Sequence, residues 1–162
     1  MTALSIIELP DERLRSVSSP VEQFDSQLAS LVVDLRDTLA KEGGIGISAP
    51  QLGVLSQVVL INVPDDGLGE MVYVNPQILA RSSWGFVQES CLSVPGISGL
   101  VFRATNITVS AYDALGNPFE TQVTGMHAVC LQHEIDHLEG TLFVDRLSWF
   151  KKLRLRLEGK AF

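Results

Sequence analysis

The residues best able to do chemistry in this chain form the segment His133-Glu134-Ile135-Asp136-His137. Residues four apart on a helix lie on one face, one turn along, so His133 and His137 can reach the same metal ion. Glu134 lies about 100° further around such a helix, beside the ion rather than on it. A general base for a metal-activated water is needed there, so the segment predicts a mononuclear hydrolytic site.

The same five residues can also arise by chance, in which case their polar side chains would simply be hydrogen-bonded. The setting favours the metal site. The surrounding residues are apolar on most sides of the predicted helix, which is typical of a buried helix. Buried polar side chains are costly unless they are paired or bind something, so a metal accounts for them better.

A catalytic ion needs a third protein ligand and one open position. The candidates for the third ligand are Cys91, His127, Cys130, Asp136 and Glu139. Cys130 would place three ligands on one straight helix and crowd one side of the ion. Cys91 can approach from a separate strand and complete a tetrahedron more easily, so the residues alone favour it slightly.

Three helices are predicted around these residues. The first begins near Asp25 or Ser26, carries a stripe of Leu and Val at three- and four-residue steps, and ends at Gly43-Gly44. The second, which carries both histidines, runs over about 124–138 and stops at Gly140. The last begins near Ser148.

Runs of Val, Ile and Leu predict strands, and the segment 113–117 predicts a hairpin turn between the last two. The strands are expected over 57–62, 71–74, 106–112 and 118–123. We therefore expect an α+β fold in which antiparallel strands pack around a central buried helix carrying the two histidines, with an N-terminal and a C-terminal helix. The length suits one catalytic domain over residues 1–162.

Composition limits the class of protein. Apolar residues make up 46% of the chain, which is enough for a core. No apolar run approaches the about 18 residues of a membrane span, and the first ten residues lack the plan of a signal peptide. The two cysteines do not suggest a disulfide framework. We expect a cytoplasmic protein.

Charge is unevenly distributed. The formal net charge of −7 argues against a protein that binds nucleic acid over its whole surface. The last fifteen residues are basic, however, and could meet an anionic partner, although a solvated helix end explains their charge equally well.

Three blocks together resemble the peptide deformylase family. They are Gly44-Ile-Gly-Ile-Ser-Ala-Pro-Gln-Leu-Gly53, Glu89-Ser-Cys-Leu-Ser93 and Gln132-His-Glu-Ile-Asp-His-Leu-Glu-Gly140. Their order and spacing match the family, and the likeness extends over nearly the whole chain. The resemblance implies removal of the formyl group from the N-terminal formyl-methionine of new proteins.

The resemblance also implies roles for individual residues. Cys91, His133 and His137 are expected to hold the ion, and Glu134 to move the proton. The Gln51 side chain and the Leu92 backbone N–H are expected to stabilise the oxyanion. The substrate peptide should pair with backbone at Ile45 and Gly46. The methionine pocket is placed at Val87, Met126, Val129 and Cys130.

The metal and partners follow from the same resemblance. One cysteine and two histidines suit zinc, iron(II), nickel or cobalt, and the resemblance implies iron(II) as the natural metal. It further suggests that the basic last helix docks on the ribosome, where formylated chains emerge. Glu89 and Arg103 are candidates for an ion pair that supports the ligands.

Two positions depart from the family pattern. Ser48 stands where alanine is usual and Ser90 where glycine is usual. These departures leave open a homologue that binds metal or formylated peptides without rapid turnover. Another metal-dependent amidase or peptidase is a further alternative, against which Cys91 and the block ending at Gly53 argue.

Overall fold

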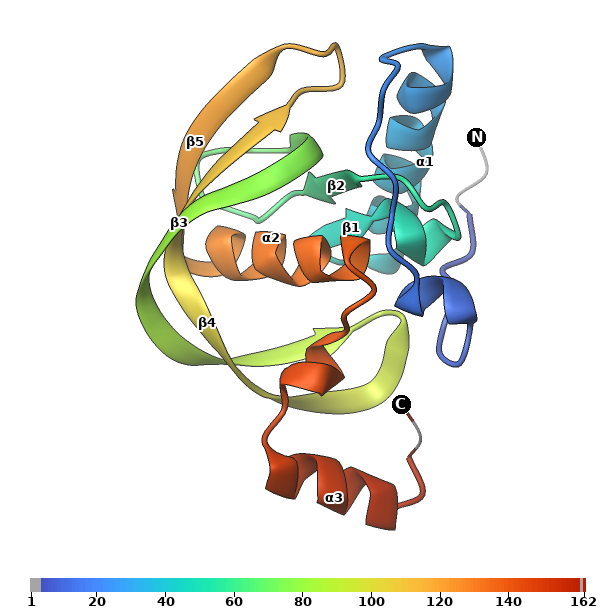
Figure 1. The fold of residues 1–162 in the computed structure, drawn as a ribbon, viewed down its shortest axis with the longest axis vertical. Coiled ribbons are helices and arrows are strands. Elements are labelled where there is room, and N and C mark those ends of the chain that lie inside the picture. The colour runs from blue at the N-terminus through green and yellow to red at the C-terminus, as the bar shows by residue number, and fades with distance from the viewer. Residues whose placement is uncertain (1–3, 161) are drawn as a thin grey trace.

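The computed structural model describes residues 4–160 and 162, which form three α-helices and a five-stranded antiparallel sheet (Figure 1). The helices are α1 (Ser26–Glu42), α2 (Gly125–Leu138) and α3 (Trp149–Leu157). The strands follow chain order across the sheet and are β1 (Gly46–Ser48), β2 (Val58–Ile61), β3 (Met71–Cys91), β4 (Val94–Tyr112) and β5 (Pro118–Thr124). The expected α+β class with antiparallel strands is confirmed.

Helix α1 begins and ends where the sequence predicts. The Asp25 side chain accepts hydrogen bonds from the backbone N–H groups of Gln27 and Leu28, which are left without helical partners at a helix start. Gly43 ends the helix with a left-handed backbone at φ +68°. The apolar stripe of α1 is buried in one cluster with side chains of β1 and β2.

Strands β3 and β4 are much longer than predicted. The expected end of the strand at residue 74, just before Asn75-Pro76, is wrong, because the β3–β4 pairing shifts register between Val74 and Gln77 and then continues to Cys91. Proline cannot donate to the ladder, and an irregularity of this kind accommodates it. The extension is what brings Cys91, at the end of β3, back toward the helix.

Helix α2 lies in the curve of the sheet (Figure 1), and all its residues from His127 to Leu138 are buried. It contacts β1, β2, β4 and β5. Gly140 follows the helix with φ +69°, and a Cβ there would collide with the backbone carbonyl of Arg15. Because α2 is buried on nearly all sides, each of its polar side chains needs a partner.

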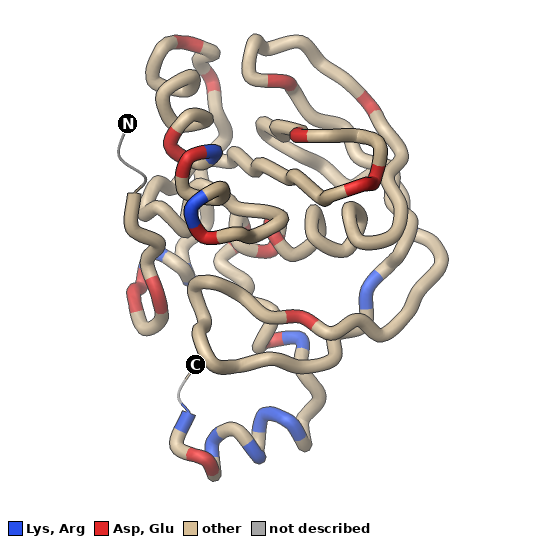
Figure 2. The backbone as a smooth tube through the Cα atoms, turned by 180° about the vertical axis from the view of Figure 1, so that it is seen from behind, with Lys and Arg blue, Asp and Glu red and all other residues tan. Residues whose placement is uncertain are grey.

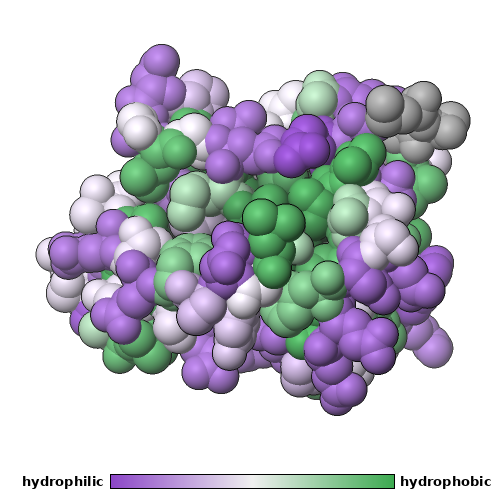
Figure 3. Space-filling view, turned by 90° about the horizontal axis from the view of Figure 1, so that it is seen from above, coloured by the Kyte–Doolittle hydropathy of each residue, from purple (hydrophilic) through white to green (hydrophobic). Residues whose placement is uncertain are grey.

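Each of the three sequence motifs contributes residues to a different apolar cluster. Cys130 and Ile135 of α2 pack with the sheet in one cluster, Cys91 packs with Phe143 in a second, and Ile47 packs with α1 in a third. The functional residues therefore lie where the clusters meet. Hydrophobic residues also reach the surface between hydrophilic ones on the face in Figure 3. Within the described residues, none of the helices combines the length and apolar character that a membrane crossing requires.

Candidate metal centre

Cys91, His133 and His137 meet inside the protein. Their ligand atoms lie within 4.8 Å of one another, and all three residues are buried. Sγ of Cys91, from the end of β3, lies 3.3 Å from Nε2 of His137 on α2. Among the described residues, this is the set of side chains that the structure brings together for a metal ion.

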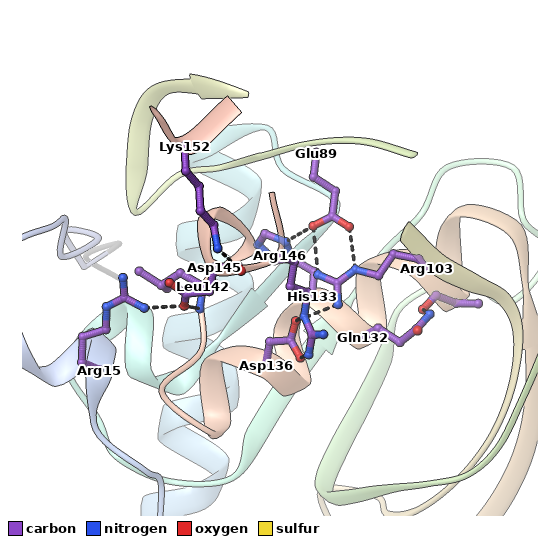
Figure 4. A network of polar contacts seen from close by, with 11 residues as sticks. Arg15, Glu89, Arg103, Gln132, His133, Asp136, Leu142, Asp145, Arg146 and Lys152 are labelled. Atoms are coloured by element: carbon purple, nitrogen blue, oxygen red, sulfur yellow. Dashed lines mark hydrogen bonds and ion pairs between the residues drawn. The ribbon is translucent and has the colours of Figure 1, made fainter. Parts of the chain in front are cut away.

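The other candidates for the third ligand are engaged elsewhere. Asp136 accepts hydrogen bonds from Arg103 at 2.7 Å and from Arg146 at 2.6 Å (Figure 4). His127 bonds Asp66 and Tyr73. Cys130 is buried beside Gly46, and Glu139 lies on the surface after α2. The role of Asp136 as a partner of two arginines was not predicted, because both arginines come from other segments.

Glu89 supports His133 from the side opposite the ligand set. Its Oε2 lies 2.9 Å from Nδ1 of His133, and Arg103 donates to both carboxylate oxygens at 2.7 and 3.0 Å (Figure 4). The expected ion pair between Glu89 and Arg103 is thus confirmed. Burial raises the pKa of Glu89, but the hydrogen bonds from His133 and Arg103 outweigh it and lower this pKa to about 2. A carboxylate that accepts from Nδ1 leaves Nε2 of the imidazole free for a metal.

The pKa values of the two imidazoles are shifted in opposite directions. Burial lowers the pKa of His133, yet its hydrogen bonds with Cys91 and Glu89 hold that pKa well above the ordinary value. Burial, followed by the positive charges of His133 and Arg103, lowers the pKa of His137 well below the ordinary value. His137 is therefore neutral, which is the form that binds a metal.

Glu134 lines the same cleft as Cys91 and His133. It is 3% exposed, and its Oε2 has no hydrogen-bond partner among the described residues. Burial raises its pKa, which the charge of His133 and a hydrogen bond with Ser48 partly offset. A buried carboxylate oxygen without a partner is costly, so it indicates a missing group. Together with one thiol and two imidazoles, this unpaired oxygen fits a divalent ion and its water.

Gln51 and Leu92 lie beside the ligands. Oε1 of Gln51 accepts from the backbone N–H of Ser48 at 2.9 Å and from its hydroxyl at 3.1 Å. The amide nitrogen is thereby turned toward Sγ of Cys91, 3.8 Å away, and Oγ of Ser93, 3.4 Å away. Leu92 follows Cys91 directly in the turn between β3 and β4. Both residues line the cleft that contains His133.

That cleft has a volume of about 750 Å³. Five of the six residues expected to bind substrate line it, namely Ile45, Gly46, Met126, Val129 and Cys130. Val87 is not among its lining residues. It shares the inward face of β3 with Glu89 but lies two residues, about 7 Å, further along the strand. Pro95, Gly96 and Ile97 also line the cleft, and their nearness to Cys91 in the sequence was the available signal.

Comparison with known proteins agrees with this geometry. Residues 3–153 match the polypeptide deformylase family. The crystal structure of a peptide deformylase from Legionella pneumophila is 44% identical, with a TM-score of 0.90 and coverage of 96% of this chain and 92% of that one.

Two further solved structures are similar over nearly their whole length. Peptide deformylase from Ehrlichia chaffeensis in complex with actinonin is 36% identical, has a TM-score of 0.89, and the match covers 98% of this chain and 96% of that one. Peptide deformylase 1B from Arabidopsis thaliana in complex with an inhibitor is 38% identical, with a TM-score of 0.89 and coverage of 96% and 87% respectively. The chain belongs to the polypeptide deformylase family of enzymes.

Proposed function

We propose that this protein removes the formyl group from the N-terminal formyl-methionine of newly made proteins and releases formate. Membership of the family supports this activity. The observation that carries it is the meeting of Cys91, His133 and His137 at the wall of one cleft, where a buried oxygen of Glu134 has no hydrogen-bond partner among the described residues.

Cys91, His133 and His137 would hold one divalent ion. When bound, such an ion lowers the pKa of its water to about 7, so that a nucleophile exists at neutral pH. We propose iron(II) as the natural metal, with zinc, nickel or cobalt as substitutes, since one thiolate and two imidazoles suit all four.

Glu134 would carry the proton through the reaction. Its carboxylate takes a proton from the attacking water, whose oxygen bonds to the formyl carbon. The bond from carbon to the methionine nitrogen then breaks as Glu134 passes the proton to the departing amine, and the formic acid that is left ionises to formate. The raised pKa of Glu134 suits a group that must both accept and return a proton near neutral pH.

Gln51 and Leu92 would stabilise the charge that develops on the formyl oxygen. An amide carbon is a poor electrophile, and two oriented N–H donors lower the barrier to its tetrahedral state. The nitrogen of Gln51 faces Cys91, and the backbone N–H of Leu92 follows that ligand in the chain, so both donors belong to the immediate surroundings of the ion.

The substrate would lie along Ile45 and Gly46, with its backbone paired to theirs. Gly46 admits a close approach because it has no side chain. The methionine side chain would enter the apolar part of the cleft at Met126, Val129 and Cys130.

The test is formate release by anaerobically prepared protein, with its metal content measured by mass spectrometry. Formyl-Met peptides should yield formate and acetyl-Met peptides should remain intact. Actinonin, which is bound to the Ehrlichia protein, should inhibit the reaction. Metal-loaded protein that binds formyl-Met peptides without releasing formate would instead favour a binding homologue, and cleavage of internal peptide bonds would favour a peptidase.

We further propose that α3 docks on the ribosome. Lys and Arg gather on α3, while acidic residues predominate elsewhere on the chain (Figure 2). Trp149 and Phe150 at its start are 67% and 77% exposed. Arg156→Glu should weaken salt-sensitive co-sedimentation with ribosomes and leave turnover of short peptides unchanged, whereas the exposed control Arg81→Glu should change neither. Equal co-sedimentation of the two variants would contradict the proposal. We also propose a cytoplasmic location, which is consistent with Cys91 and Cys130 not forming a disulfide.

A further inference from the structure

Ser48 gives two hydrogen bonds to one atom of the cleft. Its side chain is completely buried, at the start of the short turn Ala49–Leu52. Both its backbone N–H and its hydroxyl donate to Oε1 of Gln51, at 2.9 and 3.1 Å. Nothing in the three-ligand site requires a hydroxyl at this position, and an alanine would leave the amide oxygen with a single donor.

The second donor matters because the two ends of a carboxamide have nearly the same shape. Only the oxygen accepts and only the nitrogen donates, so a 180° rotation of the amide exchanges their roles. With its oxygen on Ser48, Gln51 presents its NH2 group to Cys91 and Ser93. The rotated amide would place an NH2 group against two donors and an oxygen against the Cys91 sulfur.

We propose that Ser48 is a positioning residue for deformylation, whose hydroxyl holds the Gln51 amide with its NH2 group directed at the reacting oxygen. This inference rests on the proposed function. Donors that are held in place before reaction stabilise a developing charge without first having to reorient. A freely rotating amide would spend part of its time with the wrong end toward the substrate.

Ser48 could also affect the reaction through Glu134 instead of through Gln51, and the two effects must be distinguished. The hydroxyl donates to Gln51, but it also faces Glu134 and helps to lower the pKa of that carboxyl. A hydroxyl has a single proton to give, so it cannot donate to Gln51 and Glu134 at once. If Ser48 acted on the reaction through Glu134, its effect would persist without the Gln51 side chain, and a double-mutant cycle distinguishes the two routes.

The cycle compares Ser48→Ala, Gln51→Ala and the double variant by their kcat and KM for a formyl-Met peptide. Loss of one neutral hydrogen bond predicts a fall in kcat of about three- to tenfold for Ser48→Ala, with KM nearly unchanged. In the Gln51→Ala background the same change should have no further effect. An equal loss in both backgrounds, or no loss in either, overturns the proposal.

A matched control is Ser18→Ala, since Ser18 is a buried serine whose hydroxyl has no partner among the described residues. It should leave kcat unchanged.

A readout without turnover completes the test. In zinc-loaded protein, the side-chain NH2 resonances of Gln51 are identified by their absence from the Gln51→Ala spectrum. They should be sharp and distinct in the wild type, and should move or broaden in Ser48→Ala. Unmoved resonances overturn the positioning role whatever the kinetics. Wild-type protein that released no formate would overturn the proposed function itself, while these resonances would still report how the amide is held.

Discussion

The carboxylate of Glu89 lies 2.9 Å from Nδ1 of His133, and this contact decides which nitrogen of the imidazole faces the ligand set. Nδ1 donates its proton to Glu89, so Nε2 is the nitrogen left to bind a metal, and it gives up its own proton when the metal binds. Arg103 holds Glu89 from the other side with two hydrogen bonds and also bonds Asp136 on the same helix. The orientation of one ligand thus depends on a buried ion pair from β3 and β4.

Glu89→Gln should therefore weaken metal binding. The variant keeps the size of the side chain but loses the charge that holds the Nδ1 proton. We expect the affinity for zinc to fall about 10- to 100-fold, as measured by competition with a chelator. Glu120→Gln, which removes an exposed carboxylate from β5 of the same sheet, should bind zinc like the wild type. Equal affinities in the two variants would contradict the supporting role of Glu89.

Acid should destabilise the protein through the same carboxylate. The pKa of Glu89 is about 2 in the folded protein against 4.5 in the unfolded chain, so its stabilisation is complete above pH 4.5 and is lost as the pH falls toward 2. A shift of this size corresponds to about 3 kcal/mol of unfolding free energy. Denaturant unfolding across this interval, with a chelator present so that metal release does not contribute, should show the decline. Glu89→Gln should show a shallower one, and parallel curves would contradict the assignment.

The two cysteines should differ sharply in their effect on metal content. Cys91→Ala removes a member of the ligand set and should abolish stoichiometric metal binding. Cys130→Ala removes a buried thiol from the cleft wall, and should keep the metal. Mass spectrometry of both purified variants measures this directly, and the reverse pattern would reassign the third ligand.

Glu134→Gln should separate metal binding from catalysis. The side chain is not part of the ligand set, so the metal should stay. Without a carboxylate to move the proton, kcat for formyl-Met peptides should fall about 10²- to 10⁴-fold. Normal turnover by this variant would show that another group carries the proton.

Much of the fold was predictable because its signals are local. Asp25 caps α1, and Gly43 and Gly140 end helices, since each acts on neighbouring backbone groups. The long reach of β3 was not predictable. Its outer face carries exposed residues such as Phe86, 72% exposed, so the alternation between core and solvent that marks a strand is obscured there.

In the candidate site, too, the residues set by local structure were predictable and those set by packing between distant segments were not. The spacing of His133 and His137 follows from one helix, whereas Cys91 could be favoured over Cys130 only slightly, because their placement depends on how β3 packs against α2. The two arginines that bond Asp136 are Arg103 on β4 and Arg146 in the turn after α2, and no local sequence pattern predicts that these segments come together.

Gly46 should be the least replaceable glycine in the cleft. A Cβ built on it would collide with Sγ of Cys130 and would lie 3.0 Å from Cδ1 of Ile61 and 3.2 Å from Oε1 of Glu134. These neighbours are packed together, so Gly46→Ala must displace the Cys130 side chain, β1 or the Glu134 carboxylate. A displacement of about 1 Å at reacting groups can cost about 10²-fold in rate.

We accordingly expect Gly46→Ala to retain its metal, because none of the three atoms nearest to the new methyl group belongs to a ligand, and to lose about 10²-fold in kcat/KM. Gly85→Ala on β3 is the matched control, since its Cβ would meet only Thr105 Cγ2 at 3.9 Å, and it should be as active as the wild type. Full activity in Gly46→Ala would mean that the cleft wall yields without moving Glu134, and would contradict the close packing argued for this glycine.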